Sequence, residues 1–223
     1  MNRASAHKRP KMSEREGFAA FVLRMRAIGL HDPRLFAAIE SVQRQSFIDV
    51  NWMDLAYSSR TIPLPCGEYI ESLDEQTRIL SALNIEQNHR ILEIGTGSGF
   101  TAAVMGRLAT RVTSLDRYRS LCEHARSCIQ ALQIENINVK HADGRHGAAG
   151  GPFDRIISWV AFEELPKHYI DLLATHGVLI APVGPGDAVQ VMTKLSKVGS
   201  RFEQEELLYV RYQPFIDGLS SVL

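Results

Sequence analysis

Hydrophobic residues in the first third of the chain recur at helical spacing. The helix expected over residues 14 to about 30 has an apolar face made by Phe18, Phe21, Val22 and Met25. Asp32 followed by Pro33 is typical of an N-cap and a first helical residue, so a second helix is expected there. Residues 43–71 show no regular period, and a third helix is expected over residues 72–83. These patterns predict a helical N-terminal region.

From residue 90 the pattern changes to short apolar runs that alternate with amphipathic helices. Strands are expected at residues 91–94, 112–116, 137–140, 153–160 and 177–183, and helices at residues 101–108, 118–132 and 165–173. Such alternation predicts a parallel sheet with right-handed crossovers and helices on both faces. Two more strands, 189–197 and 205–212, have no helix between them and should pair antiparallel at the sheet edge. The expected fold class is α/β, a doubly wound and mostly parallel seven-stranded sheet.

These elements give a simple organisation along the chain. Residues 1–13 are expected to form a disordered tail, residues 14–84 a helical region on the substrate side, and residues 85–223 the α/β core. A chain of 223 residues lies in the size range of one structural domain with an appendage. We therefore expect one domain overall.

The composition does not favour a nucleic-acid, membrane or metal partner. Lys and Arg together number 25, as do Asp and Glu, so no net field attracts nucleic acid or an anionic membrane. No apolar run reaches the roughly 20 residues that span a bilayer. Cys66, Cys122 and Cys128 lack the spacing of a metal site and are expected to be free thiols of a reducing compartment. We expect a cytoplasmic monomer without a metal, a membrane or a nucleic-acid partner.

The clearest chemical signal is a glycine-rich turn between the first core strand and its helix. The turn carries the candidate ligand-binding residues Glu93, Gly95, Thr96, Gly97 and Gly99. Glycines let the backbone turn sharply and allow a ligand to approach it closely. Phe100 stands where a dinucleotide-binding turn needs its third glycine, whereas an acidic residue followed by alternate glycines is the form of S-adenosylmethionine-binding turns. The alternative is a tight turn without a ligand.

Two carboxylates follow the turn at the ends of the next strands. Asp116 ends the second core strand, where its oxygens can accept hydrogen bonds from both hydroxyls of a ribose. Asp143, followed by Gly144, ends the third, where it can bind the amino group of adenine. Both can instead be ordinary caps at strand ends. Together with the glycine turn they predict S-adenosylmethionine as the cofactor and S-adenosylhomocysteine as its product.

Five segments together have the pattern of a known family: Val42 to Phe47, Leu92 to Val104, Ala142-Asp143-Gly144, Pro152 to Ile157 and Ala181 to Pro185. With them the chain resembles the protein-L-isoaspartate O-methyltransferase family over nearly all of residues 14–215. The resemblance implies the Rossmann-like fold of class I methyltransferases. It also implies methylation of the α-carboxyl of isoaspartyl residues in damaged proteins, which begins their repair. The partners would then be proteins or peptides that bear isoaspartyl residues.

The substrate loop departs from the family pattern. The family carries Thr-Ile-Ser just before a helix, but here Pro63-Leu64-Pro65 is followed by a different sequence through Ser72. Ser72 is the one hydroxyl near the place of the family's serine and is therefore the candidate catalytic residue. It also opens the capping-box pattern Ser72-Leu73-Asp74-Glu75, so capping is the alternative role.

The same loop is acidic, although the family's acceptor is itself a carboxylate. The acids are Glu68, Glu71, Asp74 and Glu75. Two carboxylates ~5 Å apart at an effective dielectric constant near 20 repel by about 3 kcal/mol. We expect these acids to form an exposed helix start that faces away from the acceptor. Two alternatives stay open: a methyltransferase of this fold with a different acceptor, and a non-catalytic S-adenosylmethionine-binding protein with a decayed substrate loop.

Overall fold

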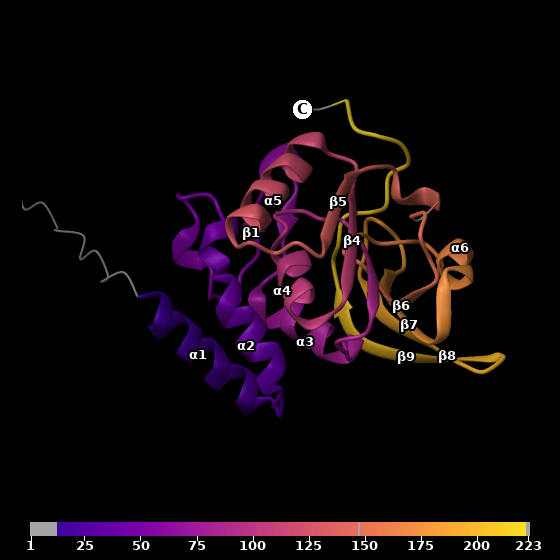
Figure 1. The fold of residues 1–223 in the computed structure, drawn as a ribbon, viewed down its shortest axis with the longest axis horizontal. Helices are drawn as coiled ribbons and strands as arrows, with labels where there is room; N and C mark the ends of the chain where they lie inside the picture. The colour runs from indigo at the N-terminus through magenta and orange to yellow at the C-terminus, as the bar shows by residue number, and fades with distance from the viewer. Residues whose placement is uncertain (1–12, 147, 222–223) are drawn as a thin grey trace, which may run out of the picture.

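The computed structural model describes residues 13–146 and 148–221, so the expected disordered tail lies, apart from Ser13, outside the described residues. Three helices form the N-terminal region: α1 (Glu14–Ala27), α2 (Pro33–Val42) and α3 (Leu73–Leu83). Each starts at a residue whose side chain accepts from the first turn, namely Ser13, Asp32 and Ser72. The helices expected from the hydrophobic spacing are therefore confirmed (Figure 1).

A seven-stranded sheet forms the other part of the molecule. Its strands are β3 (Arg90–Ile94), β4 (Arg111–Asp116), β5 (Ile137–His141), β6 (Phe153–Ser158), β7 (Leu173–Val183), β8 (Gln190–Val198) and β9 (Arg201–Val210). They lie in the order β5-β4-β3-β6-β7-β8-β9. The first five are parallel, whereas β8 and β9 are antiparallel to their neighbours. The expected fold class, including the antiparallel pair at the edge, is confirmed.

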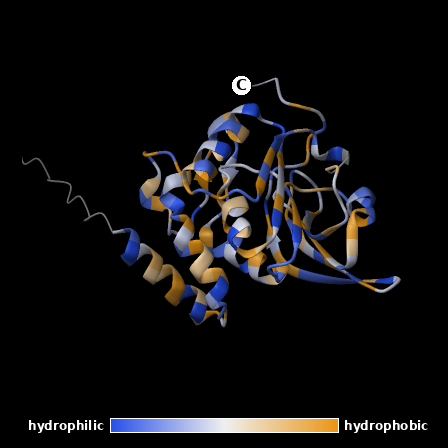
Figure 2. Ribbon diagram, viewed as in Figure 1, coloured by the Kyte–Doolittle hydropathy of each residue, from blue (hydrophilic) through white to orange (hydrophobic). Residues whose placement is uncertain are grey.

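The central and edge strands of the sheet differ in how deeply their residues are buried. In β3 every residue after Arg90 is buried, because helices cover both faces of a parallel sheet. β9 is exposed over its first six residues, and its hydrophilic stretch is visible in Figure 2. Among residues 13–146 and 148–221, no helix combines the length and apolar character that a bilayer crossing requires.

Helices α4 (Phe100–Leu108), α5 (Arg119–Ala131) and α6 (Lys167–Asp171) connect the core strands. The last helix is shorter than the expected range 165–173, because it begins after Pro166 and β7 begins as early as Leu173. Residues 43–71 contain three short 3₁₀ turns, η1 (Arg44–Phe47), η2 (Met53–Leu55) and η3 (Pro65–Gly67). They also contain a two-stranded sheet of β1 (Ile62–Pro63) and β2 (Tyr69–Ile70). A fourth 3₁₀ turn, η4 (Gly144–His146), follows β5. The sequence pattern did not predict these short elements, because each has too few residues to show a period.

The N-terminal region packs into the core of the sheet. One buried cluster contains Phe21 and Phe47 together with Ile91 and Phe100. The rings of Phe47 and Phe100 meet edge to face with centroids 5.9 Å apart. The helices that precede the sheet in sequence therefore fix the position of the loop that precedes α3.

The chain order places a ligand site at the centre of the sheet. From β3 the chain moves outward through β4 to β5, then returns to β6 on the other side of β3. Loops that leave the carboxyl ends of β3 and β6 therefore diverge, which leaves a crevice at this switch point. The glycine turn follows β3, and Trp159 follows β6 at the same edge of the sheet.

Candidate active site

The glycine turn between β3 and α4 is held against the neighbouring strand. The amides of Gly95 and Thr96 both donate to the carbonyl of Leu115 in β4, at 2.8 and 3.2 Å. Gly95 adopts φ +88°, and a Cβ there would lie 3.3 Å from Cβ of Trp159. Gly99 adopts φ +87°, and a Cβ there would lie 2.6 Å from Cβ of Ala125. Glycine is required at both positions: at Gly95 because Trp159 in the crevice wall lies close, and at Gly99 because Ala125 of α5 packs against the backbone.

Asp116 lies at the carboxyl end of β4 and lines the crevice. One carboxylate oxygen accepts from the amide of Gly97 at 2.9 Å, and the other accepts from the amide of Tyr118 at 3.0 Å. Burial raises the pKa of Asp116, while these two amides act in the opposite direction. Each carboxylate oxygen has a second lone pair, so the fixed carboxylate can still accept from two hydroxyls of a ligand.

Glu93 lies behind the turn rather than in the lining of the crevice. Its carboxylate is fully buried and accepts from Thr101 at 2.5 Å, Ser114 at 2.6 Å and the indole of Trp159 at 2.9 Å. These donors come from α4, β4 and the segment after β6. Burial, the largest effect, raises the pKa of Glu93 to about 7, although all three donors act to lower it. Glu93 thus joins the elements around the crevice.

The crevice encloses about 830 Å³ when the solvent at its open mouth is included. One wall is formed by the turn from Gly95 to Ser98, and another by Asp116 to Tyr118. The segment from Gln213 to Ile216, after β9, closes a third side. Within the part of the chain that the structure describes, no three His, Cys, Asp or Glu side chains gather in a way that would hold a metal ion.

Asp143 and Gly144 follow β5 at the same edge of the sheet. Gly144 lines the crevice, and a Cβ there would lie 3.1 Å from Ile94 and 3.3 Å from Phe215. The Asp143 carboxylate accepts from the amides of Arg145 and Gly218, each at 2.9 Å. Asp143 therefore fastens the C-terminal segment beside the crevice, and the contact with adenine stays a prediction.

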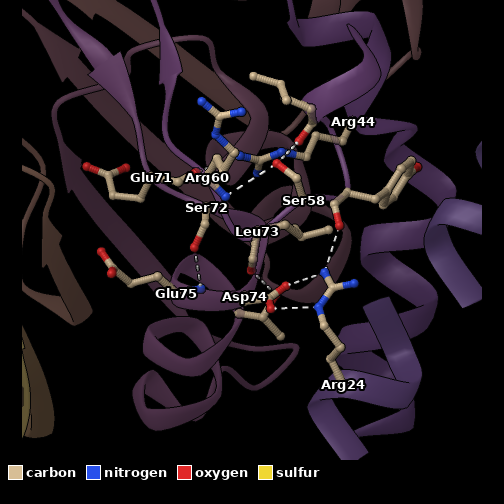
Figure 3. A network of polar contacts seen from close by, with 12 residues as sticks. Arg24, Arg44, Ser58, Arg60, Glu71, Ser72, Leu73, Asp74 and Glu75 are labelled. Atoms are coloured by element: carbon tan, nitrogen blue, oxygen red, sulfur yellow. Dashed lines mark hydrogen bonds and ion pairs between the residues drawn. The ribbon is translucent and has the colours of Figure 1, made fainter. Parts of the chain in front are cut away.

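Ser72 is placed as the N-cap of α3. Its hydroxyl accepts from the amide of Glu75 at 3.2 Å, as Figure 3 shows, and Ser72 is not among the residues that line the crevice. Glu75 does not complete the capping box with its side chain but accepts from the hydroxyl of Tyr212 at 2.6 Å. The capping role is confirmed, and the substrate role of Ser72 stays a prediction.

The acidic loop is not the exposed helix start that we expected. Asp74 is paired with Arg24 of α1, whose guanidinium binds both carboxylate oxygens at 2.7 and 2.8 Å. Glu75 is partly buried against Tyr212. Glu71 is 4% exposed and lines the crevice together with Glu68. The expectation was wrong because the loop folds inward between α1 and the sheet, and sequence spacing alone does not reveal that packing.

A buried arginine, Arg44, stabilises this loop through hydrogen bonds. Arg44 has no exposed surface and lies over the ring of Phe100, with Cζ 4.7 Å from the ring centroid. One terminal nitrogen donates to the side-chain oxygen of Gln76, and the other donates to the carbonyl of Glu71 at 2.7 Å. The guanidinium thus binds a backbone carbonyl and a neutral amide side chain, and the two residues that carry them, Glu71 and Gln76, line the crevice.

Sequence reasoning did not select the residues that form this wall of the crevice and support it. Arg44 lies in η1, Glu71 in the loop after β2 and Gln76 in α3, and no spacing rule brings them together. Gln213 also lines the crevice, and its buried Nε2 has no hydrogen-bond partner among the described residues. A buried amide donor of this kind needs an oxygen acceptor, which a ligand can supply. The one available signal was the charge of Arg44 within an otherwise uncharged segment.

The sheet order, the glycine turn and the carboxylate at the end of β4 define a class I methyltransferase fold. The model of the protein-L-isoaspartate(D-aspartate) O-methyltransferase family matches residues 19–220, which is most of the chain. The chain belongs to this family, as the sequence resemblance predicted.

Curated relatives cover nearly the same length. The protein-L-isoaspartate O-methyltransferase of Rhizobium meliloti is 40% identical over 202 residues, which are 90% of this chain and 99% of the relative. That of Roseobacter denitrificans is 36% identical over 211 residues, which are 94% of this chain and 99% of the relative. The matches therefore span nearly the whole length of both relatives.

Solved structures agree on the fold. A Plasmodium falciparum chain described as a protein-L-isoaspartate O-methyltransferase, in complex with S-adenosyl-L-homocysteine, superposes with a TM-score of 0.76 at 20% identity. The match covers 88% of this chain and 97% of that one. A second protein-L-isoaspartate O-methyltransferase gives a TM-score of 0.78 at 22% identity, over 93% of this chain and 67% of that one.

Replacing Glu93 by Gln should change how stability depends on pH. The pKa of Glu93 is raised from 4.5 to about 7 in the fold, so its proton stabilises the folded state. This contribution is complete below about pH 4.5 and is lost as the pH rises through about 7. Between pH 5 and pH 8, the wild-type free energy of unfolding should fall by about 2–3 kcal/mol relative to that of Glu93→Gln. Urea denaturation measures the difference, and a constant difference would contradict the prediction.

Proposed function

We propose that this chain is an S-adenosylmethionine-dependent methyltransferase that methylates the carboxyl group of L-isoaspartyl residues in damaged proteins. The observation that carries the proposal is the crevice at the switch point, where a glycine turn and a fixed strand-end carboxylate face a second, polar wall. Its support is membership of a family whose curated relatives are named for this activity.

The residues around the crevice fit an adenosine cofactor. The turn from Gly95 to Gly99 brings backbone without side chains to the crevice, and Asp116 is held ready to accept from ribose hydroxyls. Asp143 and Gly144 lie beyond Asp116, where the adenine end would extend. Thr96 and Glu93 support the turn through Ser114 of β4. When bound, S-adenosylmethionine supplies an electrophilic methyl group.

Methyl transfer to a carboxylate requires little acid–base catalysis by the protein. A side-chain or terminal carboxylate has a pKa near 4 and is ionised at neutral pH, so it attacks with its own lone pair. No residue of this chain has to remove a proton. The residues of the crevice must bind the acceptor, align it and exclude water. Trp159 and Ile70, both buried in the crevice wall, contribute apolar surface to that exclusion.

The remaining expectations concern partners and location. We propose a monomer that acts in the cytoplasm on protein or peptide substrates, without a nucleic-acid partner. The balanced charge, 25 basic against 25 acidic residues, supports the absence of a nucleic-acid partner. The free thiols Cys66, Cys122 and Cys128 support a reducing compartment.

The first test is methyl transfer from labelled S-adenosylmethionine to a synthetic isoaspartyl peptide, with the normal aspartyl peptide as the matched control. We expect base-labile methyl esters on the isoaspartyl peptide alone. Equal transfer to both peptides would contradict the substrate assignment. Tight cofactor binding without transfer to either peptide would instead support the non-catalytic alternative.

Asp116→Ala should weaken binding of S-adenosylhomocysteine by about 1–3 kcal/mol, because a ligand hydroxyl would lose its charged acceptor. Isothermal titration calorimetry measures the dissociation constant. Asp187→Ala removes an exposed carboxylate away from the crevice and serves as the control. An unchanged affinity of Asp116→Ala would refute the ribose role.

Ser72→Ala separates the two roles of Ser72. Loss of the cap should lower the free energy of unfolding by about 1 kcal/mol. If Ser72 also orients the acceptor, kcat/KM for the isoaspartyl peptide should fall by far more than the stability change explains. Ser72→Asn keeps a capping oxygen and should restore stability without restoring the hydroxyl. Full activity in both variants would exclude the substrate role.

A further inference from the structure

Two carboxyl groups of the substrate loop, those of Glu68 and Glu71, line the crevice and conflict with an anionic acceptor, and Glu71 is the buried one of the two. Glu71 lies at the end of the substrate loop, directly before the cap residue of α3. This is where the family carries Thr-Ile-Ser. In Figure 3 its side chain and that of Glu75 project to the same side, away from the Arg24–Asp74 pair. Glu71 is among the residues that line the crevice, whereas Ser72 is not.

The groups that face Glu71 come from four elements. Gln76 of α3 directs its amide nitrogen to the Glu71 carboxylate at 3.4 Å. Arg44 of η1 lies close by but uses both terminal nitrogens on Gln76 and on the Glu71 carbonyl. Glu75 of α3 adds a negative charge, and its carboxylate accepts from the hydroxyl of Tyr212, after β9, at 2.6 Å. Tyr69 of β2 lies within electrostatic reach as well.

This environment favours the neutral form of Glu71. Burial, the largest effect, together with the charge of Glu75 raises the pKa of Glu71 to about 8, and Arg44 and Gln76 offset only part of that rise. A neutral carboxyl group is a hydrogen-bond donor as well as an acceptor. At neutral pH the side chain is thus able to donate a proton in a hydrogen bond to an oxygen in the crevice.

We propose that Glu71 is an acceptor-binding residue that donates its O–H to one oxygen of the isoaspartyl carboxylate. The proposal rests on the function proposed above and identifies what fixes the acceptor in a chain without Thr-Ile-Ser. The proton remains on Glu71 throughout. The second carboxylate oxygen keeps its lone pair for the methyl group. Ionisation of Glu71 removes the donor and places a like charge beside the acceptor.

Binding of the acceptor without turnover tests this directly. An N-acetylated, C-amidated isoaspartyl peptide without other titratable groups is titrated into the protein saturated with S-adenosylhomocysteine, from pH 6 to pH 9.5. The wild-type dissociation constant should be flat to about pH 8 and should then rise by up to about tenfold per pH unit. The same alkaline fall should appear in kcat/KM for methyl transfer.

Glu71→Gln keeps a donor at nearly the same place but cannot ionise. At pH 7 its dissociation constant should lie within about threefold of the wild-type value, and it should stay flat to pH 9.5. Glu75→Gln is the matched control: it should keep the alkaline weakening, with the midpoint moved to lower pH because a neighbouring negative charge is gone.

Two results would overturn the proposal while leaving the proposed function intact. One is a wild-type dissociation constant that does not change between pH 6 and pH 9.5. The other is a Glu71→Gln variant that folds and binds S-adenosylhomocysteine normally but no longer binds the peptide at any pH. A wild-type protein that binds S-adenosylhomocysteine but neither binds nor methylates the isoaspartyl peptide would instead refute the proposed function itself.

Discussion

The candidate active site depends on one buried carboxylate, that of Glu93. It accepts from Thr101 of α4, Ser114 of β4 and Trp159 after β6, so a single side chain joins the elements that surround the crevice. A buried carboxylate is costly unless donors surround it, and three donors hold this one in a single position. The glycine turn therefore lies on a rigid base, as a site that aligns two reactants requires.

The N-terminal region contributes the second wall of the crevice through a different use of buried charge. Arg44 stabilises the loop by donating to the Glu71 carbonyl and to the Gln76 side chain. Arg24 pairs with Asp74, which does not line the crevice. Of the four acids, Asp74 and Glu75 are thus bound to side chains outside the crevice, whereas Glu68 and the buried Glu71 line it. The crevice wall with the glycine turn and the wall with Glu71 are thus built by separate parts of the chain.

Much of this architecture follows from local patterns. The periodicity of Phe18 to Met25 predicted α1, and the alternation after residue 90 predicted a mostly parallel sheet with an antiparallel edge. The turn at Gly95 and the carboxylate of Asp116 were predictable because their spacing relative to a strand is fixed by the βαβ unit. The exposed placement of Glu71 was wrongly predicted, because a polar residue before a helix is usually solvated.

The sequence by itself determined the fold class, the glycine turn and the family, because each is encoded in residues close together along the chain. Only the tertiary structure decided which side chains meet across the crevice. Glu71 and Gln213, which both line the crevice, are 142 residues apart along the chain (213 − 71), and their meeting there depends on how the N-terminal helices and the C-terminal segment pack on the sheet. The charge state of Glu71 is set by that packing, because desolvation and the proximity of Glu75 exist only in the folded chain.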